Sequence, residues 1–416
     1  MRKDSRGLEI SCASGQALEH YLRGQHQALS LDSTGIPEFR QAVELDPDFA
    51  LAHAALARQL QIHGFSSEAS SGFENALNLA NQVSGTENSA VKFAAAAANG
   101  EAHAIAMGLN HVEEHPNDVF VLAHLLGPFG LLAFSGDSLW REKNVSLIDT
   151  VKPAYSSDDW WFNTSVAFLY AEVENLSKAD AFAQRAWNLD QNGNTAHTMA
   201  HVHYEACALE EGGQFLDEWL TTHGLTSDMR HHLLWHQILL QLEKEEPIDL
   251  LSVYGAELDA TVCDPMPLTT LCDNASLLWR CVLLEVPVPK PLANDVLEFG
   301  QKYFSTPGFV FAEFHQTMVA AIAGSPFELA EPLWLSSIGE AFRAFVSRDY
   351  QRSIALLEKS RQDTVLLGGS NPQRCIVEDT LLEACVRAGK KERGLQLMNQ
   401  RGRSTPAESS WRSRLS

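Results

Sequence analysis

The sequence predicts an all-α protein in which pairs of helices repeat along the chain. Apolar residues recur with the helical period through most of the 416 residues, and we find no convincing alternating run that would indicate a strand. Two distant segments also match, AVELDPDFALAHAAL from Ala42 and AWNLDQNGNTAHTMA from Ala186. Each reads as a helix end, a short turn and a new helix that opens on Ala-His. We therefore expect a tetratricopeptide-like α-solenoid, a superhelix that either closes around a central pocket or stays open.

The Ala-His pairs set the period of the repeat. They end at His53, His124 and His197, at intervals of 71 and 73 residues, each about twice the ~34-residue tetratricopeptide period. His232 follows His197 by 35 residues, and the later units are longer. The first helix of each hairpin lines the concave face of such a solenoid. We therefore expect these histidines to lie on one inner surface.

The remaining units follow in order along the chain. Helical segments start near residues 90 and 160, and later ones surround Asp273 and His315. IGEAFRAFVSRDYQRSIALLEKSRQ then predicts a further hairpin, and PQRCIVEDTLLEACVRAG forms the last one together with KKERGLQLMNQR. The segments VSGTEN, LEVPVPKPL and STPGF are rich in turn formers and predict loops. We divide the chain into an N-terminal helical segment (1–36), repeats that line a histidine-rich concave pocket (37–330), and C-terminal repeats with a tail (331–416).

The composition disfavours several kinds of partner. The formal net charge is −22, so nucleic acid and anionic membranes would be repelled. The seven cysteines are dispersed and form no CxxC, which predicts neither a disulfide framework nor a thiolate metal cage. No segment has signal-peptide character, and eighteen apolar residues never run unbroken. We expect a cytoplasmic protein that binds neither nucleic acid nor membrane.

Two histidine pairs point to a metal site. His197 and His201, like His232 and His236, are four residues apart, so each pair shares one helix face. Two such pairs on consecutive first helices present four imidazoles to one point, a set that binds zinc, iron, copper or nickel. Glu205 lies one further turn along the face of His201. The alternative for each pair is a structural role in the core or at the surface.

Other polar residues complete the expected pocket. We predict that Glu205, Asp273, His315 and His124 act as acid/base groups or orient the metal ligands. As an alternative, a carboxylate of Glu205, Asp273 or Glu313 completes the metal shell. We expect His53 to contact the ligand or to pack between repeats. In LLGGSNPQR, Ser370 or Asn371 caps a helix, and with Arg374 in its first turn the segment would bind an anionic group. The remaining histidines read as surface or turn residues: His20, His26, His63, His103, His111, His115 and His223.

Common catalytic motifs are missing from the sequence. It contains no GxxxxGK[ST], GxGxxG or GxSxG motif. It also lacks HExxH, because the residues between His197 and His201 are Thr198, Met199 and Ala200, so the glutamate of that motif is absent. A P-loop enzyme, a dinucleotide-binding enzyme and a zincin protease are therefore disfavoured. The functional hypothesis therefore depends mainly on the two histidine pairs.

In their order and spacing, AHTMAH, HHLLWHQILLQLE, DNASLLWR, FAEFH and LLGGSNPQR resemble the tetratricopeptide repeat protein 38 family over nearly the whole chain. The resemblance assigns family positions to the histidines named above, to Asp273 and to a GGSN-x-QR run. The matched positions are His53, His124, His197, His201, His232, His236, His315, Asp273, Gly368, Gly369, Ser370, Asn371, Gln373 and Arg374. This chain departs from the family at Cys375, where an acidic residue is usual, and beside the second histidine pair at His231, Leu233 and Leu234. The family name describes repeats and implies no reaction.

Two functions follow as hypotheses. The first is a small-molecule enzyme on a tetratricopeptide scaffold, whose histidine and carboxylate pocket binds a small polar or carboxylate-bearing ligand and supports metal-dependent hydrolysis or oxidation, or acid/base catalysis by imidazole without metal. The second is an adaptor that binds a peptide or protein in its groove without catalysis. The groove offers His, Asp and Trp rather than the Lys, Arg and Asn of many peptide-binding adaptors, which favours the enzyme. We also expect that the protein forms a homodimer.

Overall fold

The computed structural model describes residues 2–83, 85–224, 227–259, 266–306, 308–327 and 332–416, and within these residues the protein is built from helices. The exception is a two-residue antiparallel ladder near the N-terminus, formed by β1 (Arg2–Lys3) and β2 (Glu9–Ile10). The all-α class expected from the sequence is therefore confirmed. No helix in the described residues is long and apolar enough to cross a membrane.

The chain forms two compact units. The first comprises Met1–Val202 and His223–Met229, and the second comprises His203–Thr222 and Arg230–Ser416. The domain boundaries expected after residues 36 and 330 stay predictions. The helices up to the division are α1 (Gly15–Leu29), α2 (Gly35–Leu45), α3 (Ala50–Ile62), α4 (Ser66–Ala80), α5 (Gly85–Ala98), α6 (Ala104–Glu114), α7 (Val119–Leu125), η1 (Ala133–Ser135), α8 (Trp140–Val151), η2 (Lys152–Ala154), α9 (Trp160–Glu172), α10 (Leu176–Leu189) and α11 (Gly193–Glu205), within which the division falls.

The second unit contains the rest of the helices. They are α12 (Leu209–Thr222), α13 (Arg230–Glu243), α14 (Leu250–Val253), the π-helical turn η3 (Tyr254–Leu258), α15 (Pro267–Leu283), α16 (Lys290–Tyr303), α17 (Val310–Ala323), α18 (Leu333–Val346), α19 (Tyr350–Ser360), η4 (Arg361–Leu367), α20 (Asn371–Arg374), α21 (Ile376–Arg387), α22 (Lys391–Arg401) and α23 (Pro406–Leu415).

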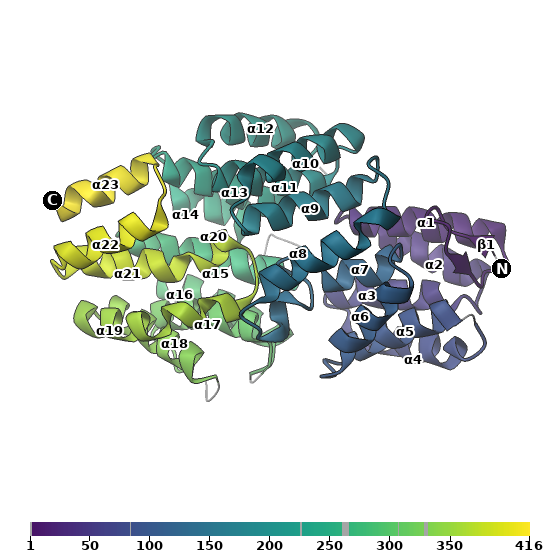
Figure 1. Ribbon diagram of the computed structural model, residues 1–416. Helices are drawn as coiled ribbons and strands as arrows, with labels where there is room; N and C mark the ends of the chain where they lie inside the picture. The colour runs from purple at the N-terminus through teal and green to yellow at the C-terminus, as the bar shows by residue number, and fades with distance from the viewer. Residues whose placement is uncertain (1, 84, 225–226, 260–265, 307, 328–331) are drawn as a thin grey trace. The chain divides into compact units, whose positions relative to one another are not determined.

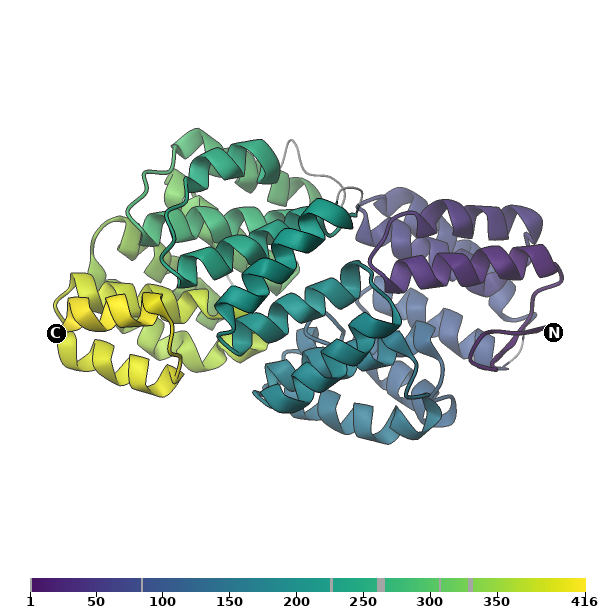
Figure 2. The same ribbon diagram turned by 90° about the horizontal axis from the view of Figure 1, so that it is seen from above.

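Helices that follow one another in the sequence pack as pairs. The clearest pairs are α1 with α2, α3 with α4, α9 with α10, and α18 with α19 (Figure 1). In the second view the purple pair α1 and α2 and the yellow pair α22 and α23 again lie side by side (Figure 2). The helical hairpin is thus the building unit in both halves of the chain.

One backbone hydrogen bond recurs at the turns inside these hairpins. The N–H groups of Phe65, Asn175 and Lys390 each donate over 2.8 Å to the carbonyl five residues earlier. The residue before each donor has positive φ, which is the left-handed ending common to helices; it is glycine at Gly64 but a strained non-glycine at Glu174. The same bond forms at Glu101, Ala208, Glu246, Val286 and Asp349. This bond recurs after 33 residues from Asn175 to Ala208 and after 41 residues from Asp349 to Lys390.

Aromatic side chains fill the core of each unit. In the first, the ring of Tyr21 lies 5.8 Å from that of Phe39 and 5.1 Å from that of Phe49. In the second, Trp279 packs 4.4 Å from Phe342, and its indole N–H donates to the Thr380 hydroxyl over 2.8 Å. These large rings bury apolar area, and the buried indole N–H of Trp279 has a hydrogen-bond acceptor within the protein.

Candidate metal centre

The first histidine pair lies on α11. Asn192 caps this helix, since its side-chain oxygen accepts the backbone N–H groups of Asn194 and Thr195 at 3.0 and 3.1 Å. His197 and His201 follow on one face, and only 4% and 1% of their surfaces are exposed. Their Nε2 atoms are 2.9 Å apart. The spacing expected from the sequence therefore brings the Nε2 atoms of both rings to one place.

The second pair lies on α13. His232 and His236 are 4% and 1% exposed, and their ring centroids are 4.8 Å apart. Trp235, which is fully buried, stacks on His232 at 5.4 Å and meets His236 edge-on at 4.9 Å. The indole thus restricts the orientation of both imidazoles.

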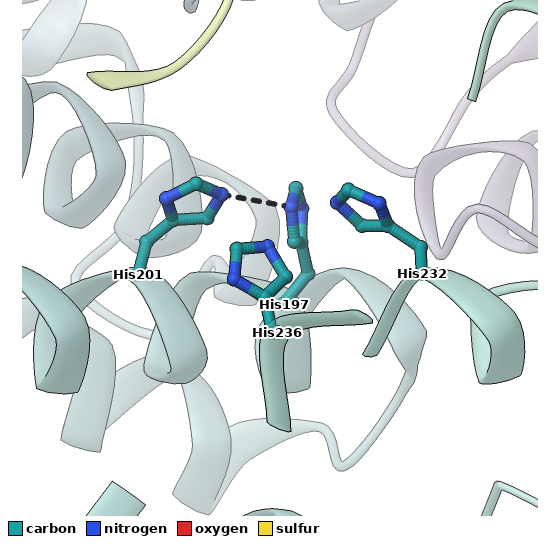
Figure 3. A group of neighbouring side chains, drawn as sticks. All are labelled: His197, His201, His232 and His236. Atoms are coloured by element: carbon teal, nitrogen blue, oxygen red, sulfur yellow. Dashed lines mark hydrogen bonds between the residues drawn. The ribbon is translucent and has the colours of Figure 1, made fainter. Parts of the chain in front are cut away.

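The four imidazoles form one buried group. Each histidine offers a ligand atom, and all four atoms lie within 4.8 Å of one another. Figure 3 shows the nitrogen atoms of the four rings facing one another, with the His197–His201 contact drawn as a dashed line. The cluster could hold a metal ion.

Asp273, on α15, orients one of these rings. Both of its oxygens lie 2.9 Å from Nδ1 of His232, and the carboxylate is 3% exposed. A carboxylate accepts hydrogen bonds, so Nδ1 of His232 carries the hydrogen, and Nε2 is the nitrogen that could coordinate an ion. Burial raises the pKa of Asp273, and the neighbouring His232 opposes that rise. This carboxylate–histidine arrangement is the usual support of a metal-ligating imidazole.

The nitrogen separations test whether one ion fits. Two ligands about 2.05 Å from one ion are about 2.9 Å apart at a right angle, about 3.3 Å apart in a tetrahedron and about 4.1 Å apart when opposed. The 2.9 Å between His197 and His201 matches neighbouring ligands of a square or octahedral ion. The upper bound of 4.8 Å is wider than any of these separations. At that bound two ligand atoms would have to approach by about 0.7 Å to be opposed on one ion, and by about 1.5 Å to be neighbours in a tetrahedron.

Side chains near the C-terminus fasten the ends of α11 and α13 inside the second unit. Arg403 lies 3.9 Å from the Glu205 carboxylate and 3.5 Å from that of Glu243, which ends α13. Its guanidinium carbon is 4.4 Å from the ring centroid of Tyr204, and Thr405 donates to Glu243 over 2.7 Å. No local sequence pattern indicates this contact, because Arg403 is almost 200 residues from α11 in the chain.

Glu205, predicted as an acid/base group, is held by the GGSN turn. Both of its oxygens accept from the side-chain amide of Asn371, at 3.1 and 2.9 Å. Ser370 caps α20 with a capping box to Gln373, as the sequence predicts, and Arg374 donates to the Gly369 carbonyl. Gly369 has φ of +68°, and a Cβ there would meet the Phe311 ring at 2.3 Å. The turn therefore requires glycine and places Asn371 against α11, while anion binding by Ser370, Asn371 and Arg374 stays a prediction.

The other predicted histidines occupy different surroundings. His315 is fully buried and His124 is 8% exposed; each donates from Nδ1 to the carbonyl four residues earlier, Phe311 at 2.8 Å and Phe120 at 2.6 Å. Burial lowers the pKa of His315 to about 4 and, together with the charge of Arg58, that of His124 to about 3. Both imidazoles are therefore neutral at pH 7.

His53 is half-buried on α3, where its Nε2 lies 2.9 Å from the Pro47 carbonyl. Within the described residues, His53, His124 and His315 are not part of the group of four. His111 was expected at the surface or in a turn, and this expectation is wrong: it is 4% exposed at the end of α6. Cys263 lies outside the described residues.

Arg280 was not predicted from the sequence as a site residue. It lies seven residues after Asp273, two turns along α15, and is 7% exposed. Its guanidinium carbon is 5.7 Å from the ring centroid of Trp235, which packs on His232 and His236. The i, i+7 spacing from Asp273 was the available signal, because residues two turns apart share a helix face. No protein-family model matches the chain.

Proposed function

We propose that this protein is a metal-dependent enzyme acting on a small polar molecule, with His197, His201, His232 and His236 as the metal ligands. The observation that carries the proposal is the buried group of four ligand atoms within 4.8 Å, one of whose rings is oriented by Asp273. A structural role alone would not require four imidazoles to face one another.

The donor set suggests which ions fit. Four neutral imidazoles are borderline ligands that suit iron, copper, nickel and zinc. Four protein ligands complete a tetrahedral zinc site, and closed sites of that kind are structural. Iron, copper or nickel with five or six ligands would keep a position open for a substrate. An open ion would supply Lewis acidity for a hydrolysis or redox chemistry for an oxidation.

The surrounding residues have separate roles in this proposal. Asp273 keeps His232 in the coordinating tautomer, and Glu205, one turn beyond His201 and held by Asn371, serves as the acid/base group. His315 and His124 remain candidates for proton transfer, with pKa values lowered by burial. The predicted membership of the tetratricopeptide repeat protein 38 family, the tetratricopeptide-like solenoid and the cytoplasmic location belong to the same proposal.

Metal analysis of the untagged protein tests the proposal. We expect about one transition-metal ion per chain after growth in metal-replete medium, and loss of that ion in His197→Ala and in His232→Ala. His203→Ala on α11 and His231→Ala on α13 are matched controls, since both lie outside the group of four. They should keep the ion.

A separate measurement tests whether the proposed metal ion has an open coordination position. Azide added to the copper- or iron-loaded protein should change its visible and electron paramagnetic resonance spectra if a coordination site is free. A parent protein that takes up no ion, either in cells or on reconstitution, would contradict the proposal and favour the adaptor. Bound zinc that is unaffected by azide would instead support a structural metal site.

A further inference from the structure

Arg280 is a buried cation without a carboxylate partner among the described residues. Its Nη1 donates to the hydroxyl of Ser276 and, over 3.4 Å, to the carbonyl of the same residue, and its Nη2 donates to the Pro372 carbonyl over 2.9 Å. All of these acceptors are neutral. A guanidinium that is 7% exposed normally faces an anion, because burying an unpaired charge is costly.

Other arginines of the second unit follow that rule. Arg401 lies 2.7 Å from a carboxylate oxygen of Asp379, and Arg387 lies 2.7 Å from one of Glu383. Both therefore form ion pairs that explain why they are buried. Arg280 differs because no carboxylate of the described residues balances its charge. An anionic acceptor from outside the chain could therefore pair with it.

The position of Arg280 joins it to the proposed metal centre. Its guanidinium packs on Trp235, which is stacked on His232, so one aromatic ring separates it from a proposed ligand. Asp273, two turns earlier on the same helix, bonds His232 directly. Burial is the main reason that the pKa of His315 is low, and the charge of Arg280 adds to that lowering, so the charge acts on the neighbouring core.

A charge balance indicates the chemistry of the missing acceptor. The four imidazoles are neutral as ligands, Asp273 contributes one negative charge, and Arg280 contributes one positive charge. A divalent ion would therefore leave this buried region with an excess of positive charge, which a low-dielectric interior does not tolerate without an anion. A guanidinium also matches the planar oxygens of a carboxylate or the oxygens of a phosphate.

We propose that Arg280 binds the anionic group of the substrate, and that the substrate of this site is a small oxyanion, a carboxylate or a phosphate. The placement of this group beside the reaction rests on the proposed function. Binding by Arg280 itself needs no bound metal and can be measured without it.

Calorimetric titration of the metal-free protein with acetate and with inorganic phosphate, at constant ionic strength, tests this proposal. We expect saturable binding of at least one of the two to the parent, and an affinity at least tenfold lower in Arg280→Met, which keeps the apolar stem over Trp235. The net charge of −22 disfavours unspecific anion binding elsewhere on the protein. Whichever of the two anions binds in an Arg280-dependent way identifies the oxyanion class.

Two further variants control for folding and for charge. Arg343→Met removes another arginine whose bond in the described residues is to a carbonyl, that of Phe327 at 2.9 Å, and should bind the anion as the parent does. Arg280→Lys keeps the charge but loses the planar fork, so binding should be intermediate. Circular dichroism establishes that each variant is folded before titration.

The outcomes separate this proposal from the proposed metal site. Arg280-dependent anion binding to a protein that takes up no metal would support the role of Arg280 and contradict the metal function. Equal anion binding by the parent and Arg280→Met, or no binding of either anion to a parent that holds metal, would overturn the role of Arg280 and leave the metal site in place.

Discussion

Two buried histidine–aspartate pairs in this chain look alike but have different surroundings. His111 Nε2 lies 2.9 Å from Asp118, and His232 Nδ1 lies 2.9 Å from Asp273. All four side chains are at most 7% exposed. The other nitrogen of His111 meets the Ser89 hydroxyl at 2.7 Å, whereas the other nitrogen of His232 belongs to the group of four imidazoles.

The difference shows what separates a structural histidine from a candidate ligand. Asp118 also caps α7, accepting the N–H groups of Phe120 and Val121 at 3.0 and 3.3 Å, so the His111 pair ties three helices together. Both nitrogens of His111 have protein partners. The His232 pair uses one nitrogen for orientation and presents the other to three further imidazoles. The environment of the second nitrogen, rather than the presence of an aspartate, distinguishes the two roles.

The largest expected effect concerns stability at the first pair. Asp118→Ala should lower the free energy of unfolding by about 2–4 kcal/mol, because it removes the cap of α7 and leaves His111 buried without its acceptor. Urea denaturation followed by circular dichroism measures the loss. Asp118→Asn keeps a capping oxygen and should lose clearly less. An Asp118→Ala variant as stable as the parent would show that the pair is not structural.

The second prediction concerns metal affinity at the other pair. Asp273→Asn should weaken metal binding about 10- to 100-fold while the fold persists, because the amide no longer holds His232 in its coordinating tautomer as a carboxylate does. Competition with a chelator of known affinity gives the dissociation constant. Asp118→Asn is the matched control and should leave metal affinity unchanged. Equal affinities in Asp273→Asn and the parent would remove the distinction between the two pairs.

The smallest effect appears as a pH dependence shared by His124 and His315. Burial holds the pKa of His315 near 4, whereas an unfolded histidine titrates near 6.5, so acid favours the unfolded chain. Stability is fully present above about pH 6.5 and falls as the pH drops toward 4. Between pH 7 and pH 5, His315 lowers the free energy of unfolding by up to about 2 kcal/mol.

Denaturation at these two pH values in His315→Leu and His124→Leu checks this expectation. Each variant should lose less stability on acidification than the parent, because one buried group that resists protonation has been removed. A variant with the same pH dependence as the parent would mean that its histidine titrates normally in the folded protein.

Local patterns in the sequence determined the helices and the two histidine pairs. A period of 3.6 residues per turn decides which side chains share a face, so the positions 197 and 201, or 232 and 236, suffice to predict each pair. Turn formers likewise predicted loops and the cap at Ser370; the structure confirms the cap, whereas residues 85–88 of the predicted loop VSGTEN belong to α5. These features depend on interactions within a few residues, which a sequence displays directly.

Only the tertiary structure decided how distant groups meet. That the two pairs form one group of four, that Asp273 accepts from His232 rather than from another donor, and that Glu205 is held by Asn371 all depend on contacts between residues 31 to 166 positions apart. The same holds for the burial of His111 and for Arg280 without a carboxylate partner in the described residues. Helix packing sets these contacts, because side-chain shape at the interfaces fixes how one helix lies on the next, and no local period encodes that choice.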